Sequence, residues 1–209
     1  MDAIATSLNT GLRKVPVWLV YLGLFLPAPY LIYLALSGAL SVEPIKALEH
    51  ELGEFALQLL VLGLAVTPLR LFTGINLMKF RRAIGVMTFV YVLLHLLVWL
   101  FLDVQILSEI WKDILKRPYI TIGMVGFVVL LPLAVTSNNW SVRRLGPRWR
   151  KLHKLAYPAA VLGAVHYVML AKGFQIEPLA YLGIILGLLA LRVRSFPWTT
   201  SQRHAGQTK

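Results

Sequence analysis

Apolar residues fill six long runs of this chain, and short polar segments separate the runs. A helix needs roughly 17 to 25 apolar residues to cross about 30 Å of hydrocarbon at 1.5 Å per residue. The runs that meet this requirement cover residues 15–37, 52–69, 83–102, 119–136, 153–171 and 178–194. The pattern predicts an all-α polytopic membrane protein, a six-transmembrane-helix bundle that forms a single domain over residues 1–209.

Prolines and charged residues set the expected boundaries of the first two spans. Pro27 and Pro29 lie inside the first run, where the missing backbone donors predict a kink. The acidic stretch 41–51 is expected to form an outer loop, with His50 at its end and at the mouth of the second span. Pro68 is expected to end the second span, because proline interrupts the helical hydrogen-bond ladder.

The segment between the third and fourth runs, residues 103–118, alternates apolar and charged positions. Ile106, Ile110 and Ile114 recur every four residues with charged side chains between them. This spacing places the apolar residues on one face of a helix. It predicts an amphipathic helix that lies in the membrane interface.

The charge distribution predicts the orientation of the bundle. The 21 Lys and Arg residues give the chain a net charge of +12, and most of them lie on alternate loops. All nine acids except Asp2 lie on the other set of loops. Positive residues mark the cytoplasmic side, so both termini are expected in the cytoplasm. A nucleic-acid surface is a poor explanation, because the basic clusters flank the apolar spans.

Composition excludes several kinds of chemistry. The chain is 58% hydrophobic with a mean hydropathy of +0.71, which is too apolar for an ordinary soluble domain. It has no cysteine, and this excludes disulfides, thiol catalysis, iron–sulfur clusters and thiolate metal sites. No G-x-G-x-x-G fingerprint follows a predicted strand, so a nicotinamide-binding domain is not expected.

Two histidines are predicted to meet inside the membrane. His95 lies 12 residues after Ala83, hence about 18 Å into the third span. His166 follows His153 by 13 residues, about 19.5 Å along the fifth span, and reaches a similar depth. Neutral imidazoles from two helices at one level can supply both axial ligands of a b-type haem. An interhelical hydrogen bond or a proton relay are the alternatives, and zinc fits less well without further ligands.

The other histidines allow more than one interpretation. His153 and His166 stand about 140° apart around the helix axis, so they need not face the same neighbour. His153 could ligate an inner haem with a non-histidine or absent sixth ligand, contact a flavin phosphate, or sit at the membrane interface. His50 could be a solvated residue or a ligand near the outer face. His204 lies in a polar tail and is not expected to have a role.

Several short motifs occur together in the order found in one bacterial family. The motifs span about residues 15–195 and are HELGEFAL, TPLR, RRAIG, YVLLH, KRPYITIG, LAVTS, RRLGPRWRKLHKLAY and AVHY. Each is weak alone, but the combination is specific. The chain resembles the MsrQ (YedZ) family, haem-binding membrane subunits of periplasmic methionine-sulfoxide reductase systems in the ferric-reductase-like transmembrane group, which also includes NADPH oxidases.

The resemblance implies a particular electron-transfer role. MsrQ-like proteins are six-helix cytochromes of the bacterial inner membrane that bind haem b, one or two per chain, and also associate with FMN. They pass electrons from the quinone pool or a cytosolic flavin reductase to MsrP, a periplasmic molybdenum enzyme that repairs oxidised methionine. The family's haem histidines match His95, His153 and His166, and its HxxG histidine matches His50. Methionine-sulfoxide chemistry is then expected in the partner and not in this chain.

Two other functions are compatible with the sequence. A related haem protein could reduce ferric chelates or quinone, and acceptor assays would separate that activity from the first interpretation. A non-redox transporter or scaffold could use the same histidines to carry protons or to make hydrogen bonds. Such a protein would show no b-type absorption.

Overall fold

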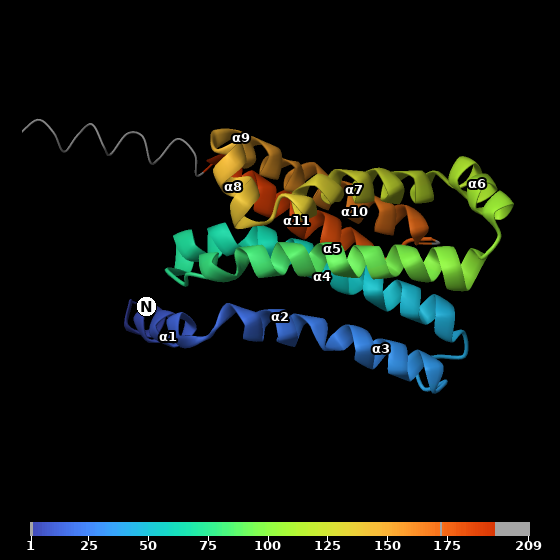
Figure 1. The fold of residues 1–209 in the computed structure, drawn as a ribbon, viewed down its shortest axis with the longest axis horizontal. Helices are drawn as coiled ribbons and strands as arrows, with labels where there is room; N and C mark the ends of the chain where they lie inside the picture. The colour runs from blue at the N-terminus through green and yellow to red at the C-terminus, as the bar shows by residue number, and fades with distance from the viewer. Residues whose placement is uncertain (1, 172, 195–209) are drawn as a thin grey trace, which may run out of the picture.

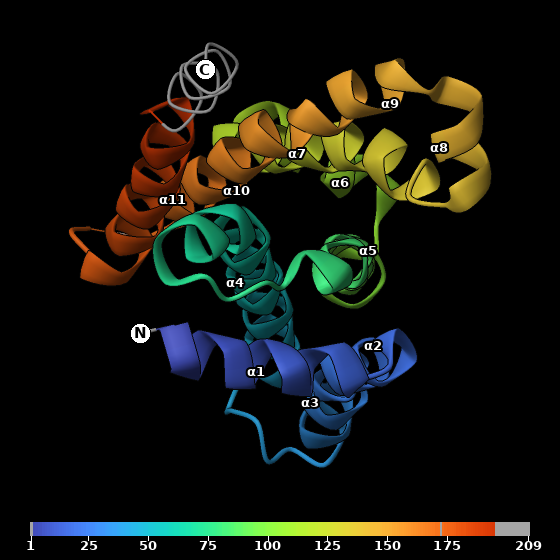
Figure 2. The same ribbon diagram turned by 90° about the vertical axis from the view of Figure 1, so that its left-hand side faces the viewer.

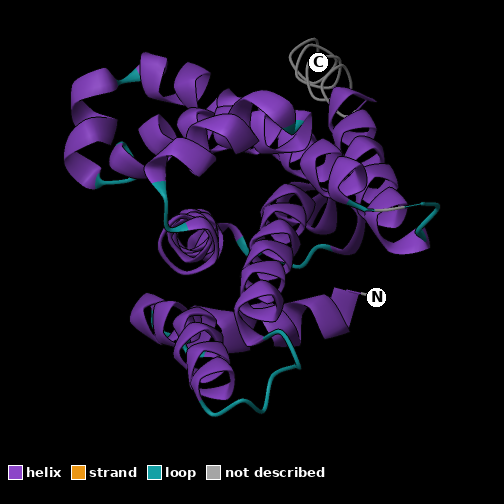
Figure 3. Cartoon of the chain, turned by 90° about the vertical axis from the view of Figure 1, so that its right-hand side faces the viewer, coloured by secondary structure: helices purple, strands orange, loops and turns teal. Residues whose placement is uncertain are grey.

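The computed structural model describes residues 2–171 and 173–194, and these residues form helices and no strands (Figure 3). The all-α prediction is confirmed for this part of the chain. His204 lies outside the described residues. The long helices run roughly side by side along one direction, and the short helices lie at the two ends (Figure 1).

The first long run forms two helices and not one. Helix α2 (Val17–Phe25) and helix α3 (Pro27–Leu36) meet at Leu26. The break confirms the predicted kink, and it follows from the backbone donors that Pro27 and Pro29 lack.

A short helix, α1 (Asp2–Lys14), precedes this pair and crosses the end of the bundle (Figure 2). It is tied to the loop after α4, because the side chain of Asn9 donates to the carbonyl of Gly74 and accepts from the backbone N–H of Asn76. Lys79 adds a second tie by donating to the carbonyls of Arg13 and Val15 at 2.9 and 2.7 Å. The apolar runs alone did not predict α1.

The second span is longer than expected. Helix α4 covers Pro44–Thr73, so the loop predicted over residues 41–51 is wrong for most of its length. The error arises because Pro44 suits the first turn of a helix, where its missing N–H is no loss. The prediction that Pro68 ends this helix is also wrong, since Pro68 lies inside α4 and Gly74 caps its end.

The third span follows after a short 3-10 turn, η1 (Met78–Phe80). Helix α5 covers Arg81–Val98 and continues as a π-helical segment, η2 (Trp99–Val104). Helix α4 packs most extensively against α5, and together they form the middle layer of the molecule (Figure 2). Tyr91 on α5 and Leu52 on α4 are completely buried.

The remaining helices form the third layer and the caps at its ends. Helix α7 (Pro118–Val135) packs against α10 (Ala156–Leu170), and α10 packs against α11 (Ile176–Arg194). The short elements are α6 (Leu107–Lys116), α8 (Asn139–Leu145), α9 (Pro147–Leu152) and η3 (His153–Leu155). Helix α6 confirms the helix predicted after the third run, and Ile110 and Ile114 pack inward as expected. Ile106 does not, because it lies just before the helix and is 60% exposed. The location of this helix in the membrane interface stays a prediction.

Within residues 2–171 and 173–194, four helical stretches are long and apolar enough to cross a membrane. They cover Val17–Leu36, Pro44–Thr73, Met78–Val104 and Pro118–Val135. Helix α10 has 15 residues, and η3 lengthens it at its start. The structure therefore supports a membrane protein with several spans, and the count of six remains a prediction.

The two ends of the bundle differ in charge. Helices α8 and α9 carry a cluster of arginines and lysines, and they lie at the same end as α1 and the start of α5 (Figure 1). Helix α6, which contains Glu109 and Asp113, lies at the opposite end. We refer to these as the basic end and the α6 end. This separation is the one that the alternating charge pattern predicted.

Candidate cofactor site

The structure brings His95 and His166 together. His95 lies in the last turn of α5, and His166 lies in the second half of α10. Their ring centroids are 6.2 Å apart, and the ring planes are nearly perpendicular at 82°. The predicted meeting of these two imidazoles is therefore confirmed, while their role as ligands stays a prediction.

A backbone carbonyl holds each imidazole. Nδ1 of His95 lies 2.8 Å from the carbonyl oxygen of Glu49 on α4. Nδ1 of His166 lies 2.7 Å from the carbonyl oxygen of Tyr119 on α7. Because a carbonyl can only accept, Nδ1 carries the proton and Nε2 has a free lone pair in each neutral ring. Both rings are thus arranged as Nε2 donors to a metal.

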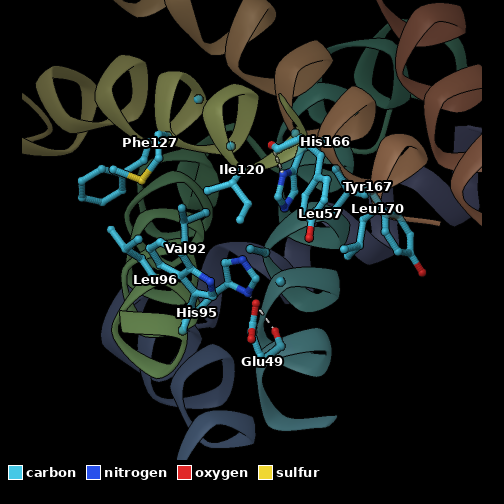
Figure 4. Close-up of a pocket in the computed structure, with 18 of the residues that line it drawn as sticks. Glu49, Leu57, Val92, His95, Leu96, Ile120, Phe127, His166, Tyr167 and Leu170 are labelled. Atoms are coloured by element: carbon cyan, nitrogen blue, oxygen red, sulfur yellow. Dashed lines mark hydrogen bonds between the residues drawn. The ribbon is translucent and has the colours of Figure 1, made fainter. Parts of the chain in front are cut away.

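A cavity of about 290 Å³ lies between α4, α5, α7 and α10, and both imidazoles line it (Figure 4). Its walls are mostly apolar, with Leu57, Val92, Ile120 and Phe127 among the lining side chains. Its polar residues come from the α6 end, namely Lys46, Glu49, His50, Glu54, Asp103 and Arg117. An apolar cavity with a few convergent polar groups is typical of a cofactor site.

The spacing of the two rings fits a bis-histidine haem. An imidazole nitrogen binds a transition metal at about 2.0–2.1 Å, so two such bonds in line place the ring centres about 6 Å apart. The observed separation is 6.2 Å. Among the described residues, no group of three or more His, Asp or Glu side chains could hold a metal ion on its own. The donor set therefore fits a porphyrin-bound iron better than a bare ion.

His153 lies apart from this cavity, near the basic end. Its ring stacks on Trp149 at 3.9 Å between centroids, and its Nε2 lies 3.0 Å from the hydroxyl of Thr136. Trp149 in turn donates to the carbonyl of Thr136. The structure thus separates His153, in η3, from His166, in α10, and the two face different neighbours.

His50 lies on α4 and not in a loop. Its side chain is exposed and belongs to the lining of the cavity at the α6 end. It follows Glu49, whose carbonyl holds His95. His50 is therefore close to the pair, and no contact places it as a ligand.

Sequence patterns do not identify the carbonyls that hold the imidazoles. The acceptors are main-chain oxygens, which no side-chain motif reveals. Gly53 and Gly123 lie directly beside the two rings, and isolated glycines inside helical runs were the available signal. Such glycines often mark a close approach.

Comparisons with known proteins show which family the chain is similar to. The profile of the family described as "Ferric reductase like transmembrane component" matches residues 52–164, which include His95 and His153. Proteins called "Protein-methionine-sulfoxide reductase heme-binding subunit MsrQ" from Brucella anthropi and Brucella ovis are each 45% identical over 197 residues. Each alignment covers 91% of this chain and 90% of the relative.

Proposed function

Because the chain belongs to the MsrQ family of haem-binding subunits, within the ferric-reductase-like membrane proteins, we propose that it is an electron-transfer subunit of a methionine-sulfoxide reductase. The observation that carries the proposal is the pair of imidazoles 6.2 Å apart, each held through Nδ1 by a carbonyl. Two neutral Nε2 atoms that face one cavity are the ligand set of a six-coordinate b-type haem.

The residues around the cavity divide the work of holding that group. His95 and His166 would hold the haem iron, and the apolar walls of the cavity would limit the access of water to it. Lys46 and Arg117 at the α6 end could pair with the carboxylates of the porphyrin. When bound, the haem supplies an iron that takes up and releases one electron, and its macrocycle spreads a charge that is otherwise costly in a low-dielectric membrane.

We place the electron's entry at the basic end and its exit at the α6 end. The donor would be a quinone or a cytosolic flavin reductase, and the acceptor a periplasmic MsrP-like molybdenum reductase that repairs oxidised methionine. The charge asymmetry of the bundle supports this direction, because the basic end is expected in the cytoplasm. The site supports it as well, since the polar lining of the cavity comes from the α6 end.

A second haem and an FMN are assigned to the basic end. His153 is the proposed ligand of an inner haem, and the cationic segment 143–154 is the proposed site of the FMN phosphate. Arginine and lysine are the usual phosphate binders, which supports the flavin assignment. We also propose six spans in one domain of the bacterial inner membrane, with α10 and α11 as the last two.

A haem-dependent ferric or quinone reductase is the second candidate function. The match to the ferric-reductase profile favours it, because that family name describes metal reduction. The two candidates differ in their acceptor. Reduced protein in vesicles should pass electrons to a periplasmic methionine-sulfoxide reductase in the first case, and to ferric chelates without any partner protein in the second.

The absorption spectrum of the purified protein tests the proposal. A reduced-minus-oxidised spectrum should show b-type Soret and α bands after haem-replete expression. His95→Ala and His166→Ala should abolish the outer haem, while His204→Ala should leave the bands unchanged. Equal haem retention in all three variants would contradict the ligand assignment. The absence of both bands in the unmodified protein would favour a non-redox transporter or scaffold.

A further inference from the structure

We infer that Gly53 and Gly123 are positioning residues that seat the two imidazoles on helix carbonyls and so select Nε2 of each as the ligand nitrogen. The inference rests on the proposed function, because it concerns the same histidine pair. Gly53 lies beside His95 and Gly123 lies beside His166, so the two positions can be tested separately. Four features of the structure carry it.

The first feature is a spacing that occurs twice. The carbonyl that holds His95 belongs to Glu49, four residues before Gly53 on α4. The carbonyl that holds His166 belongs to Tyr119, four residues before Gly123 on α7. In a helix the carbonyl of residue i accepts from the N–H of residue i+4, so each glycine lies directly below the carbonyl that takes the second hydrogen bond. A carbonyl has two lone pairs and can accept both.

The second feature is the lack of space at these two positions. A Cβ on Gly53 would lie 3.0 Å from Nδ1 of His95, and a Cβ on Gly123 would lie 2.8 Å from Nδ1 of His166. Both glycine Cα atoms therefore form part of the surface on which a ring rests. A larger residue at either position would crowd Nδ1 of the adjacent ring and disturb its hydrogen bond to the carbonyl.

The third feature is the effect of the hydrogen bond from Nδ1 to the carbonyl on the imidazole as a ligand. A hydrogen bond from Nδ1 to a carbonyl fixes the tautomer and the orientation of a ligating imidazole, and it makes Nε2 a better donor. A ring displaced by a methyl group would lose this bond or make it at a poorer angle. The nearly perpendicular arrangement of the two rings depends on both seats, because α4 holds one and α7 holds the other.

The fourth feature is the contrast with other glycines of the same cavity wall. Gly126 on α7 and Gly163 on α10 also line the cavity. A Cβ on Gly126 would meet the side chain of Leu162 at 3.6 Å, and one on Gly163 would meet Leu60 at 3.6 Å, both ordinary contacts. The tight approach is thus specific to the glycines that follow the two bracing carbonyls. Gly63 on α4 and Gly85 on α5 do not line the cavity and serve as controls. A Cβ on Gly63 would meet Ile84 at 3.7 Å, and one on Gly85 would meet nothing within 4 Å.

The test compares Gly53→Ala and Gly123→Ala with Gly63→Ala and Gly85→Ala in the full-length protein. The first two variants should weaken haem binding by about 10-fold to 100-fold, as loss of an outer hydrogen bond to a metal ligand does. The electron paramagnetic resonance signal of their low-spin ferric haem should also shift, since it reports the relative orientation of the axial rings. The two controls should keep the affinity and the signal of the unmodified protein.

Two results would overturn the inference. One is unchanged haem affinity and an unchanged resonance signal in Gly53→Ala and Gly123→Ala. The other would come from a measurement on the unmodified protein labelled with ¹⁵N-histidine. This measurement does not depend on the folding of any variant. In the diamagnetic ferrous form of the protein, two histidines should carry a proton on Nδ1, and iron-bound Nδ1 on either ring would contradict the assignment. A protein without any haem would instead count against the proposed function, so the two failures are distinguishable.

Discussion

The guanidinium of Arg192 donates to the carbonyl oxygen of Leu64, 2.8 Å away on α4. This carbonyl lies four residues before Pro68, which has no N–H to offer it. Arg192 on α11 therefore replaces the helical donor that the proline removes. Its other terminal nitrogen donates to the hydroxyl of Tyr157 on α10, so a single side chain joins three helices at one point.

Replacement of Arg192 should loosen α11 from the bundle. Arg192→Ala leaves the carbonyl of Leu64 without a partner, and a buried unsatisfied carbonyl costs about 1–3 kcal/mol of unfolding free energy. Arg192→Lys should lie in between, because an ammonium cannot reproduce the planar fork. The thermal unfolding midpoint of the detergent-solubilised protein measures the effect. Arg70→Ala, an exposed position on α4, is the matched control and should leave the midpoint unchanged.

Tyr91→Phe should weaken the attachment of α2 to α5. The Tyr91 hydroxyl on α5 donates to the carbonyl of Leu24 at 2.8 Å, next to the break between α2 and α3. Loss of this interhelical bond should lower the free energy of unfolding by about 1 kcal/mol. Tyr30→Phe removes a hydroxyl from a side chain that is 61% exposed and should have no effect. Identical unfolding midpoints for both variants would show that the bond contributes nothing.

Leu52→Ala should be more destabilising than Leu62→Ala, although both remove the same atoms from α4. Leu52 is completely buried, whereas Leu62 is 37% exposed. A truncated core leucine costs about 2–5 kcal/mol in water-soluble proteins, and the lower part of this range is expected here because lipid is as apolar as leucine. Lipid can fill the space beside Leu62 but not the space at Leu52. Comparison of the two unfolding midpoints in lipid vesicles tests this difference.

His153→Ala should separate the two interpretations of the basic end. If His153 holds an inner haem, the ratio of haem to protein should fall to about half, with the outer haem's spectrum retained. Thr136→Val is the control, because it removes only the hydroxyl that contacts Nε2 of His153 and keeps the histidine. An unchanged ratio in His153→Ala would identify His153 as an interface residue that packs on Trp149.

The apolar runs predicted the four helical stretches that are long and apolar enough to cross a membrane, because lipid imposes a simple length requirement on such helices. The meeting of His95 and His166 was predictable for the same reason, since the depth of a residue in a spanning helix follows from its position in the run. The start of α4 at Pro44 was not predictable from hydropathy, because the first turns of this helix are polar and extend beyond the apolar core.

The position of Pro68 inside α4 depends on tertiary structure. Proline usually ends a helix, and inside a helix it leaves a carbonyl that needs another donor. That donor is Arg192, more than a hundred residues further along the chain. The positions of the two imidazoles could not be predicted for a similar reason. They depend on main-chain carbonyls and on the absence of a side chain at Gly53 and Gly123.

The hydrogen bonds that join Asn9 to Gly74 and Asn76 can form only after the ribosome has made all three residues. Gly74 lies 65 residues after Asn9 in the chain, and Asn76 lies 67 residues after it. At about 5–20 residues per second, a ribosome makes Gly74 and Asn76 several seconds after Asn9. The amino-terminal helix therefore reaches its final position only after the second hydrophobic segment has left the ribosome. Until then α1 lacks the hydrogen bonds that tie it to the end of α4.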